Sequence, residues 1–543
     1  KFYLYEGKEV SEDKLIGTYN YTTGPGDVIS DAEDGSFTVH YTGPTSSYST
    51  YDGFAMEVKL HELTQFVADE VTADAMTGKA VRGSNTLMQK IHVKVSGDRG
   101  TVKVSAIKFA TTGTTALADV TSANLFYTGA TDNFTGKGLV GTATTLSADN
   151  ELTLTTPVEI RARGDFYFWL TYDIAANATA GNKIGAQLTS LTANDEVKTA
   201  TATAASREIQ AGLSGTYVIG ASDNANYKTF AEATAALANG VEGPVTFNVE
   251  NGTYAENVRI VGVQGASEQH PIVFKSLSGN PADVTITGGG YSDPAYGAHK
   301  EGMFYVDSTS YVTIKDMSFV PATQTYPYVI HLYNQSRHAT IDNVVVAAES
   351  VNGSQAASGM SLVKAEAKNE DGKNNDFLTI TNSKFTGGYI ALYLGGTSYV
   401  KLTREEGLVV KNNTITEAGS KGVYATDEDN AVISGNTITQ STAQKTNYHG
   451  IDLSRTRGKT VVSSNKIVNA NSAYSYGIEV RNESYGSENE PILVYNNSVS
   501  ITNSPNGSSA GIEIDGDNKN ISVAYNTVRI AGNGGYTFYS ARA

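Results

Sequence analysis

The chain of 543 residues contains no cysteine. This absence excludes disulfide bonds, thiol catalysis and zinc sites built on cysteine. Basic residues are also few, since 40 lysines and arginines stand against 56 aspartates and glutamates, which leaves a net charge of −16. Nucleic acid is therefore not an expected partner, because phosphate binding needs clustered basic side chains. No stretch reaches the roughly 18 apolar residues of a membrane span, so no membrane-spanning segment is expected.

Signals at the two ends of the chain are missing as well. No secretory signal is visible, and the first residue is Lys1 rather than methionine. The chain stops at Arg542 and Ala543, soon after the tyrosines of 536–539, without a recognisable cap or sorting domain. We therefore expect the native protein to extend beyond both ends.

Glycine, tyrosine and threonine are the abundant residues, with 54 Gly and 32 Tyr. This mixture favours many short strands joined by polar turns over long helices. The length allows about three domains with sizeable cores. The composition therefore predicts an all-β protein of several domains.

An internal repeat is visible in the first part of the chain. Residues 54–60 and 168–174 both alternate large apolar side chains with other residues, as strands with one buried face do. The neighbouring segments match at a similar offset, so residues 1–80 are interpreted as a partial second copy of 82–209. Strands predicted within 86–95 and 100–110 have no counterpart before Lys1, which indicates a truncated first copy. Alternatively, residues 1–80 form a shorter domain of their own.

The segment 82–209 resembles the N-terminal β-sandwich module of BNR-repeat neuraminidases. The residues that carry the resemblance lie at 83–85, 93–97, 109–115, 125–129 and 168–173. The resemblance implies an accessory β-sandwich without catalytic residues. The propeller that would supply sialidase chemistry is absent: there is no S-x-D-x-G-x-x-W box, and Trp169 is the only tryptophan. Sialidase activity is therefore not expected.

The pattern changes at Leu213. Thr229 and Glu232 have the spacing of a capping box, which predicts a helix over 230–237, and a strand is expected over 245–249. This opening resembles the start of the right-handed, pectate-lyase-like β-helix domains of secreted Bacteroidetes surface proteins. The resemblance implies a right-handed parallel β-helix over 213–543. The short helix would cover its open end, where uncovered strand edges would otherwise pair with other chains.

Short apolar strands in this region recur with the motif Asn-x-Ile/Val. The motif begins at Asn413, Asn436, Asn465, Asn497 and Asn526. Asn suits a sharp bend because it tolerates left-handed backbone and bonds its neighbours. Stacked from coil to coil, these side chains are expected to form a structural ladder. A second strand with a Gly-Ile or Gly-Val start follows each motif, as at 450–451 and 477–478.

The second strands align polar residues on one outward face, because side chains alternate between the two faces of a strand. The same position holds Tyr424, Asp452, Glu479 and Glu513, and two residues further are Thr426, Ser454, Arg481 and Asp515. Coils stack at about 4.8 Å, so like charges meet and need compensation. A carboxyl pair about 5 Å apart is also the arrangement that retaining glycosidases use.

The leading hypothesis is therefore a site on this outward acidic face. The catalytic candidates are Asp452, Glu479, Glu513, Arg455, Arg481 and His449. The ligand-binding candidates are Asp452, Arg457, Glu479, Arg481 and Asp515. Polygalacturonase and pectate lyase motifs are not found. The alternative is a solvated ladder of charges that contributes little to stability or function.

Metal sites have weaker support in the sequence. Two acidic turns could hold calcium, which prefers several oxygen ligands; they contain Asp427, Asp429, Asp515 and Asp517. Neither turn has the spacing of a complete calcium loop. His331 and His338 lie seven residues apart without a third ligand, so no metal site is expected there. No cofactor other than calcium is expected.

Three functions remain open from the sequence. The favoured one is a rod-like, secreted or cell-surface protein that binds or adheres to glycans. A place in a larger surface or secretion-linked assembly is compatible with this role. The second is a polysaccharide lyase or glycoside hydrolase with its site on the acidic face. The third is a purely structural stalk. A binding role is favoured over catalysis because no known catalytic motif is complete.

Overall fold

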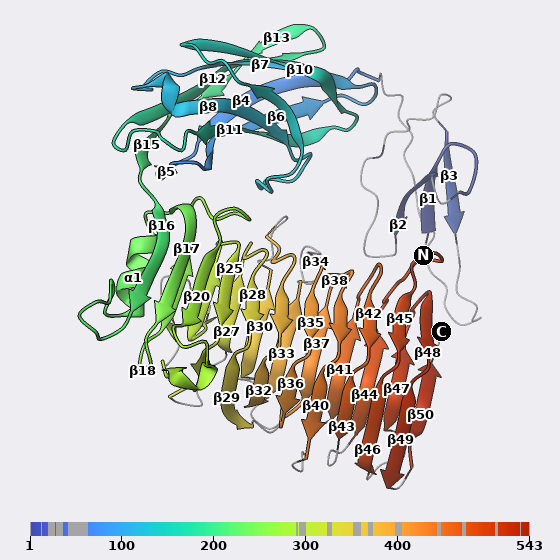
Figure 1. The fold of residues 1–543 in the computed structure, drawn as a ribbon. Helices are drawn as coiled ribbons and strands as arrows, with labels where there is room; N and C mark the ends of the chain where they lie inside the picture. The colour runs from blue at the N-terminus through green and yellow to red at the C-terminus, as the bar shows by residue number, and fades with distance from the viewer. Residues whose placement is uncertain are drawn as a thin grey trace.

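A computed structural model describes the chain over most of its length. The described residues are 2–11, 14–19, 28, 36–41, 63–288, 291–292, 300–322, 328–350, 360–367, 373–396, 404–441, 447–469, 474–504, 509–532 and 534–541. The protein is built almost entirely from strands, as predicted: antiparallel sheets form its first part, and a parallel β-helix forms the rest (Figure 1). Among these residues, no helix is long and apolar enough to cross a membrane.

Two six-stranded sheets form the β-sandwich. The first runs in the order β10-β7-β12-β15-β5 with β13 beside β12, and contains β5 (Ala80–Val81), β7 (Val102–Ala110), β10 (Asp149–Ile160), β12 (Lys183–Ala193), β13 (Glu196–Thr199) and β15 (Ala205–Gln210). The second runs β14-β4-β6-β11-β8-β9, and contains β4 (Val67–Ala75), β6 (Asn85–Ser96), β8 (Val120–Tyr127), β9 (Leu139–Ala143), β11 (Gly164–Ile174) and β14 (Thr201–Ala202). Phe168, Leu170 and Tyr172 of β11 are buried in the core between them.

The sandwich takes strands from before residue 82. Strand β4 pairs with β6 from Val67 to Ala75, and its Val71 and Ala73 side chains are buried in the sandwich core. These strands therefore lie on the N-terminal side of the boundary predicted between 80 and 82. A separate three-stranded antiparallel sheet precedes them, with β1 (Phe2–Glu6) between β2 (Leu15–Tyr19) and β3 (Phe37–Tyr41). The repeat segment 54–60 lies outside the described residues.

Three parallel sheets form the β-helix, called here sheets one, two and three. Sheet one contains β16 (Leu213–Ile219), β17 (Val241–Val249), β20 (Ile272–Ser276), β25 (Val312–Lys315), β28 (Thr340–Asp342), β31 (Thr379–Thr381), β35 (Val409–Lys411), β39 (Val432–Ser434), β42 (Val461–Ser463), β45 (Ile492–Tyr495) and β48 (Ile521–Ala524). Sheet two contains β18 (Gly252–Tyr254), β21 (Val284–Ile286), β26 (Ser318–Phe319), β29 (Val345–Ser350), β32 (Lys384–Gly388), β36 (Thr414–Thr416), β40 (Thr437–Gln440), β43 (Lys466–Asn469), β46 (Ser498–Ser504) and β49 (Thr527–Gly532).

Sheet three contains β19 (Val258–Val261), β24 (Phe304–Asp307), β27 (Tyr328–Tyr333), β30 (Ser361–Glu366), β33 (Ile390–Gly395), β37 (Lys421–Thr426), β41 (Tyr448–Ser454), β44 (Ser475–Arg481), β47 (Ala510–Asp515) and β50 (Tyr536–Ala541). Two small sheets lie outside this pattern, namely β22 (Tyr291–Ser292) with β23 (Lys300–Glu301), and β34 (Glu405–Glu406) with β38 (Glu428–Asp429). Each coil contributes one strand to each main sheet, so residues one coil apart become neighbours.

Apolar side chains inside the coils stack in columns. In sheet one, Ile433 pairs with Val462, and in sheet two, Ile438 pairs with Ile467; all four side chains are fully buried. Because the column repeats in every coil, one continuous core runs along the β-helix. The buried apolar surface is the main stabilising contribution to such a stack.

The predicted helix closes one end of this core. Helix α1 (Phe230–Leu237) begins after Thr229, whose side chain accepts a hydrogen bond from the Glu232 amide at 3.1 Å. The Glu232 carboxylate accepts the amide of Lys228, one residue before the N-cap, at 2.6 Å, so the Thr229 half of the predicted capping box is confirmed. Phe230 packs against Phe274 of β20, with 6.2 Å between ring centroids. The helix therefore covers the first coils, as the sequence predicts.

The five motif asparagines form a ladder, whose members from Asn413 to Asn497 are buried. The backbone N–H of Asn436 donates to Oδ1 of Asn465 at 3.0 Å, and Nδ2 of Asn436 donates to the same oxygen at 2.9 Å. Equivalent bonds join the other members, from Asn413 through Asn497 to Asn526. The predicted structural role is thereby confirmed.

The sharp bend lies one residue before the ladder, not at the ladder asparagine. Left-handed φ angles occur at the preceding residue, as at Asn412 (57°), Ser464 (56°) and Asn496 (55°). The ladder side chain itself points inward, and its amide bonds the next coil. The prediction that the motif asparagine makes the bend is therefore wrong, because its neighbour carries the unusual backbone.

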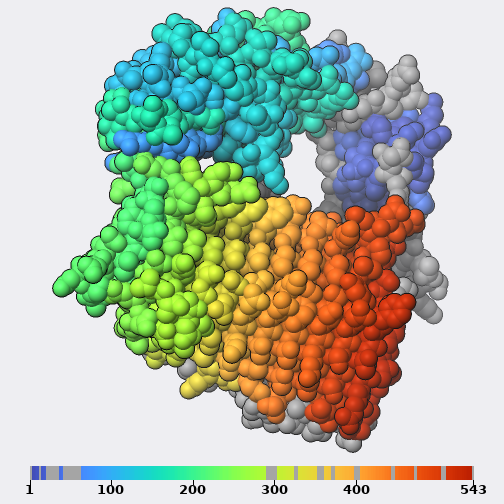
Figure 2. Space-filling model, viewed as in Figure 1, coloured from blue at the N-terminus to red at the C-terminus, as the bar shows by residue number. Residues whose placement is uncertain are grey.

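The sandwich contacts the β-helix near β27 and β28. Nε2 of Gln335 donates to the carbonyl of Phe134 at 3.4 Å, and Nη1 of Arg337 donates to the carbonyl of Thr135 at 3.3 Å. Figure 2 shows the blue-green sandwich above the green and yellow coils. The loop between β8 and β9 therefore reaches the turns that follow sheet three.

Candidate functional site

One row of outward side chains runs along sheet three. Successive strands place these residues in register: Arg259, Tyr305, His331, Lys364, Tyr393, Tyr424, Asp452, Glu479, Glu513 and Tyr539. The predicted alignment of Tyr424 with Asp452, Glu479 and Glu513 is confirmed. Several of these outward groups are nevertheless buried, including His331 and Asp452. We call this line of side chains the outward row.

Asp452 lies at the centre of an ion-pair network. Its oxygens accept hydrogen bonds from Nε and Nη2 of Arg481, each at 2.8 Å, and a third bond comes from Nζ of Lys421. Burial alone would raise the pKa of Asp452, but the bonds from Arg481 and the charge of Lys421 outweigh burial and lower it. The carboxylate is fully buried. Asp452 therefore positions the two cations and is shielded from a ligand.

Glu479 follows one coil later and is more accessible. Its Oε2 lies 2.9 Å from Nδ1 of His449 and 3.2 Å from Nε of Arg481. The His449 ring stacks on Tyr476 with 4.7 Å between ring centroids, which holds the imidazole in place. His449, Asp452 and Glu479 place possible metal-ligand atoms within 4.8 Å of one another. Because Arg481 contacts both carboxylates, their charge is already compensated without a metal.

Glu513, the third carboxyl of the outward row, is protonated more readily than an exposed carboxyl. Its side chain is half-buried, and its Oε2 has no hydrogen-bond partner among the described residues. Burial, together with the neighbouring charges of Glu479 and Asp515, raises the pKa of Glu513 to about 7. A proton is therefore held on Glu513 through much of the range in which exposed carboxylates are charged.

A second charged cluster lies earlier on sheet three. Nε2 of His331 is 3.2 Å from Oε1 of Glu366, and Nζ of Lys364 is 3.2 Å from Oε2. Burial would raise the pKa of Glu366, but His331 and Lys364 bond it and lower the pKa to about 2. Nζ of Lys364 also lies 3.3 Å from the centre of the Tyr393 ring. This cluster joins an aromatic surface to an ion pair.

Sequence reasoning missed Lys364, Glu366 and Lys421 as members of a site. The motif Asn-x-Ile that aligns the later coils is replaced in the earlier ones, where Ser383 takes the ladder position. The apolar strand pattern is the signal that could have located Lys364. Val363 is a register partner of Leu392 on the next coil. Extending that register by one residue places Lys364 on the outward row.

Arg455 and Arg457 do not join the cluster around Asp452. Strand β41 ends at Ser454, and Arg455 has a left-handed φ of 52°, so the chain turns away from the outward row. Nε and Nη2 of Arg455 bind Asp427 at 2.8 and 2.7 Å. Arg457 is exposed, 5.8 Å from the centre of the Tyr485 ring. The prediction that these arginines compensate the acidic row is therefore wrong.

The predicted calcium residues fall at two different places. Asp427 is buried and bound by Arg455, and Oδ1 of Asp429 is bound by Nη2 of Arg404 at 2.5 Å. Asp515 and Asp517 are exposed near the end of β47. The arginine partners oppose a cation at Asp427 and Asp429, because the guanidinium groups occupy their oxygens.

His338 is separate from the His331 cluster. Its ring is stacked between Tyr311 at 4.5 Å and Phe377 at 4.7 Å, measured between ring centroids. Burial lowers the pKa of His338 below its ordinary value. The two histidines therefore have separate packing roles in the described structure.

The comparisons identify the sandwich segment. Residues 80–197 match the family model described as the N-terminal domain of BNR-repeat neuraminidase, which confirms the resemblance seen in the sequence. A sequence comparison of the chain with curated proteins finds no match. The family match covers the sandwich strands β5 to β13 and does not extend into the β-helix.

Solved structures show distant likeness to larger parts of the chain. The lacto-N-biosidase of family GH136 from Eubacterium ramulus is 10% identical, with 58% of this chain and 68% of that chain covered and a TM-score of 0.38. The catalytic domain of a GH87 α-1,3-glucanase is 10% identical, with 87% and 96% covered and a TM-score of 0.29. A Hadza microbial sialidase is 11% identical, with 26% of this chain and 31% of that chain covered and a TM-score of 0.20. This chain therefore spans about a third of that sialidase.

Proposed function

We propose that the protein binds glycans along the outward row of sheet three. The observation that carries this proposal is the alignment of Tyr393 and Tyr424 with the charged cluster at Asp452, Glu479 and Glu513 on one continuous face. Aromatic rings offer apolar faces to sugar rings, and charged groups offer hydrogen bonds to hydroxyls. A row that repeats at about 4.8 Å suits an extended chain of sugars.

The pairing of charges narrows the expected ligand. Lys364 is paired with Glu366, and Lys421 and Arg481 are paired with Asp452. These basic groups of the outward row are therefore already paired, and Glu479 is itself buried beside His449 and Arg481. The half-buried carboxyl of Glu513 has an oxygen without a hydrogen-bond partner among the described residues. We infer that neutral glycans bind better than sulfated or uronate-rich ones, because like charges repel.

A glycan array probed with the purified chain tests the binding proposal. We expect neutral glycans to be retained, and Tyr393→Ala or Tyr424→Ala to weaken binding by about tenfold each, since stacking groups of this size contribute roughly 1–2 kcal/mol. Lys384→Ala, an exposed change on sheet two, is the matched control. Retention of glycans by both tyrosine variants at wild-type affinity would contradict the proposal and favour a structural stalk.

Glycoside hydrolysis is the second candidate, favoured by the state of Glu513. Retaining glycosidases use a protonated carboxyl and an ionised one about 5–5.5 Å apart. Glu513 has a pKa raised to about 7, and Glu479 occupies the same position one coil earlier. In this reading Glu513 protonates the leaving oxygen, and Glu479, held by His449 and Arg481, attacks the sugar.

Product formation from oligosaccharides separates binding from hydrolysis. If the chain is a hydrolase, Glu513→Gln and Glu479→Gln each lower the rate by about a hundredfold or more, because each removes a proton donor or nucleophile. Glycan binding without product would retain the first proposal and exclude the second. A rise in absorbance near 230 nm with uronate polymers would instead show a lyase.

We propose further that the protein works outside the cell as part of a surface structure. The family match of the sandwich and the rigid, repetitive β-helix support a role that presents a face to external polymers. Surface labelling of intact cells tests this location, with a cytoplasmic protein as control. Labelling only after lysis would contradict it.

A further inference from the structure

Two fully enclosed glutamates lie at a turn between sheets three and one. Glu405 of β34 and Glu428 of β38 are register partners on adjacent coils, with 4% and 3% of their surface exposed. They belong to a second internal column of polar side chains, away from the outward row. Glu428 lies between Asp427 and Asp429, in one of the acidic turns that the sequence offers as a weak calcium candidate, whereas no role is predicted for Glu405.

Neutral side chains occupy the other places of this column. Oδ1 of Asn375 accepts the amide of Ser336 at 2.9 Å, Oγ of Ser484 accepts the amide of Thr456 at 3.1 Å, and Oδ1 of Asn518 accepts the amide of Ser484 at 2.8 Å. One side-chain oxygen is therefore enough to accept the backbone amide of the preceding coil. Glu405 makes the same bond, since its Oε2 accepts the amide of Asn375.

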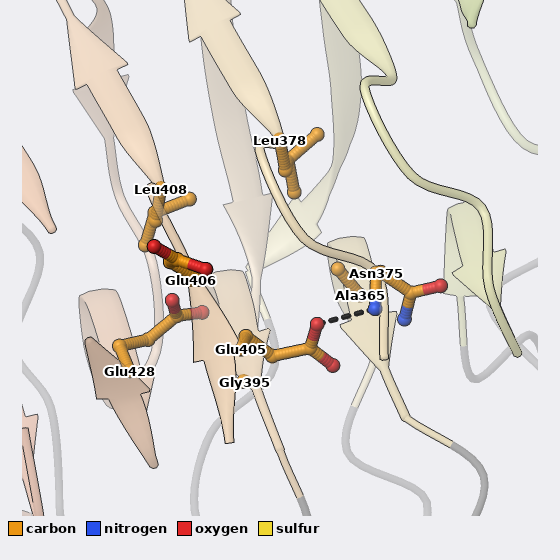
Figure 3. Close-up of a pocket in the computed structure, with 8 residues that line it drawn as sticks. All are labelled: Ala365, Asn375, Leu378, Gly395, Glu405, Glu406, Leu408 and Glu428. Carbon is orange, nitrogen blue, oxygen red and sulfur yellow. Dashed lines mark hydrogen bonds between the residues drawn. The ribbon is translucent and has the colours of Figure 1, made fainter. Parts of the chain in front are cut away.

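The glutamates bring additional oxygens that the fold does not use. Among the described residues, Oε1 of Glu405 and Oε2 of Glu428 have no hydrogen-bond partner. Both side chains line one small cavity together with Asn375, Gly395 and Glu406, with Leu378 and Leu408 as apolar walls (Figure 3). The cavity has room for about one water molecule, so it accepts a single ion and not a sugar.

Nearby positive charge is already engaged. The surrounding ion pairs are Arg337–Asp376, Arg404–Asp429 and Arg455–Asp427. Burial raises the pKa of Glu405 and of Glu428 well above the usual range, and Asp376 and the glutamates themselves add to the effect. Two buried carboxylates without a cation are costly, because their charge is neither hydrated nor paired.

We propose that a calcium-type divalent cation binds in this cavity between Glu405 and Glu428. The lining donors are oxygens without histidine or cysteine, which favours calcium, magnesium or manganese over zinc. The cation neutralises both carboxylates and ties two adjacent coils together. Its role is structural, and it is independent of glycan binding on the outward row.

Calcium titration of the full chain after removal of metals tests the site. We expect one calcium ion per chain by calorimetry and a Tm that rises to saturation with calcium. Glu405→Gln and Glu428→Gln keep the shape of the side chain, and each is expected to weaken calcium binding at least about tenfold, since ligand charge sets affinity. Both variants should have a higher Tm than the wild type when no calcium is present.

Asp517→Asn changes an exposed acidic turn and should leave calcium binding unchanged. Absence of calcium, magnesium and manganese binding to the wild type, with both glutamine variants more stable only at high pH, would show that protons neutralise the pair. That result, or loss of binding in Asp517→Asn alone, would overturn the proposal.

Discussion

At the scale of single residues, a column of glycines sets how closely the coils of sheet three approach. A Cβ added at Gly450 would lie 2.6 Å from the carbonyl oxygen of Gly477 and 2.6 Å from Cγ2 of Ile467. Gly422, Gly477 and Gly511 meet equivalent obstacles in their own coils. Each of these glycines is therefore required because its site has no room for a side chain. Its backbone conformation is ordinary and would not by itself require glycine.

Gly450→Ala should lower the free energy of unfolding by about 1–3 kcal/mol, because the methyl group collides with backbone that cannot rotate away. Gly252→Ala is the control: its nearest contact is the Tyr254 ring at 3.6 Å, an ordinary distance. Urea unfolding measures both. Equal stability of the two variants would show that the coils separate more easily than the structure indicates.

The state of Glu513 predicts a dependence of stability on pH. Its pKa rises from 4.5 to about 7 in the folded chain, so the folded state holds this proton more tightly than the unfolded state does. The stabilising contribution is complete below about pH 4.5 and is lost as the pH rises to about 7.

Glu513→Gln should therefore be more stable than the wild type at pH 8, with a difference that shrinks toward pH 4. Unfolding in urea at both values measures it, and Glu151→Gln, an exposed change in the sandwich, is the control. A difference that is independent of pH would contradict the assigned state of Glu513.

At the scale of elements, the asparagine ladder links strands of successive coils. Asn436 accepts the amide of Asn413 at 2.9 Å, and its own Nδ2 donates to the carbonyl of Val410 at 2.9 Å. The bonds that link Asn413, Asn436, Asn465 and Asn497 are buried, so removing one of these side chains leaves groups that water cannot reach.

Asn436→Ala should destabilise the chain by about 1–3 kcal/mol for each buried group that it leaves without a partner. Lys466→Ala, which removes an exposed side chain on the neighbouring strand, should change stability by less than about 0.5 kcal/mol. Thermal and urea unfolding compare them. Similar losses in both variants would mean that the ladder contributes little.

The ladder and the capping helix could be predicted because their signals repeat or are local. Asn436 and Asn465 recur once per coil, and Thr229 and Glu232 act within one turn of helix. The outward register followed from the same repeat. The direction of Arg455 could not be predicted, since it depends on a left-handed turn directly after β41.

The burial of Glu405 and Glu428 and their pairing could not be predicted for a related reason, although Glu428 lies in the acidic turn of Asp427 and Asp429. Glu405 and Glu428 lie in strands of two residues at a turn, where a period of two cannot be recognised. Acidic residues at turns are ordinarily exposed, and only the arrangement of the coils shows that these two are inside. Lys421 was missed because it precedes the glycine that begins the recognised strand pattern.

At the scale of the whole molecule, stability is distributed unevenly along the β-helix. Helix α1 covers the first coils, where Phe247 and Phe274 are fully buried. In the last coil described, Val523 and Val528 are only partly buried. In a stack in which each coil contacts its neighbours alone, opening begins where burial is least.

Hydrogen exchange followed by mass spectrometry should show this gradient. We expect amides of β48 and β49 to exchange faster than those of β17 and β20, with the central strands β39 and β42 slowest, because protection follows local opening. Uniform exchange along all coils would indicate one cooperative unit instead.

The direction of the bonds in the asparagine ladder has an electrical consequence. Nδ2 of each amide points toward the following coil and Oδ1 toward the preceding one, from Asn413 to Asn497. The amide dipoles therefore add head to tail, as peptide dipoles do in an α-helix, and each polarises the next. A column of aligned amide dipoles therefore runs through the apolar interior of the β-helix, and its positive end faces the last coil.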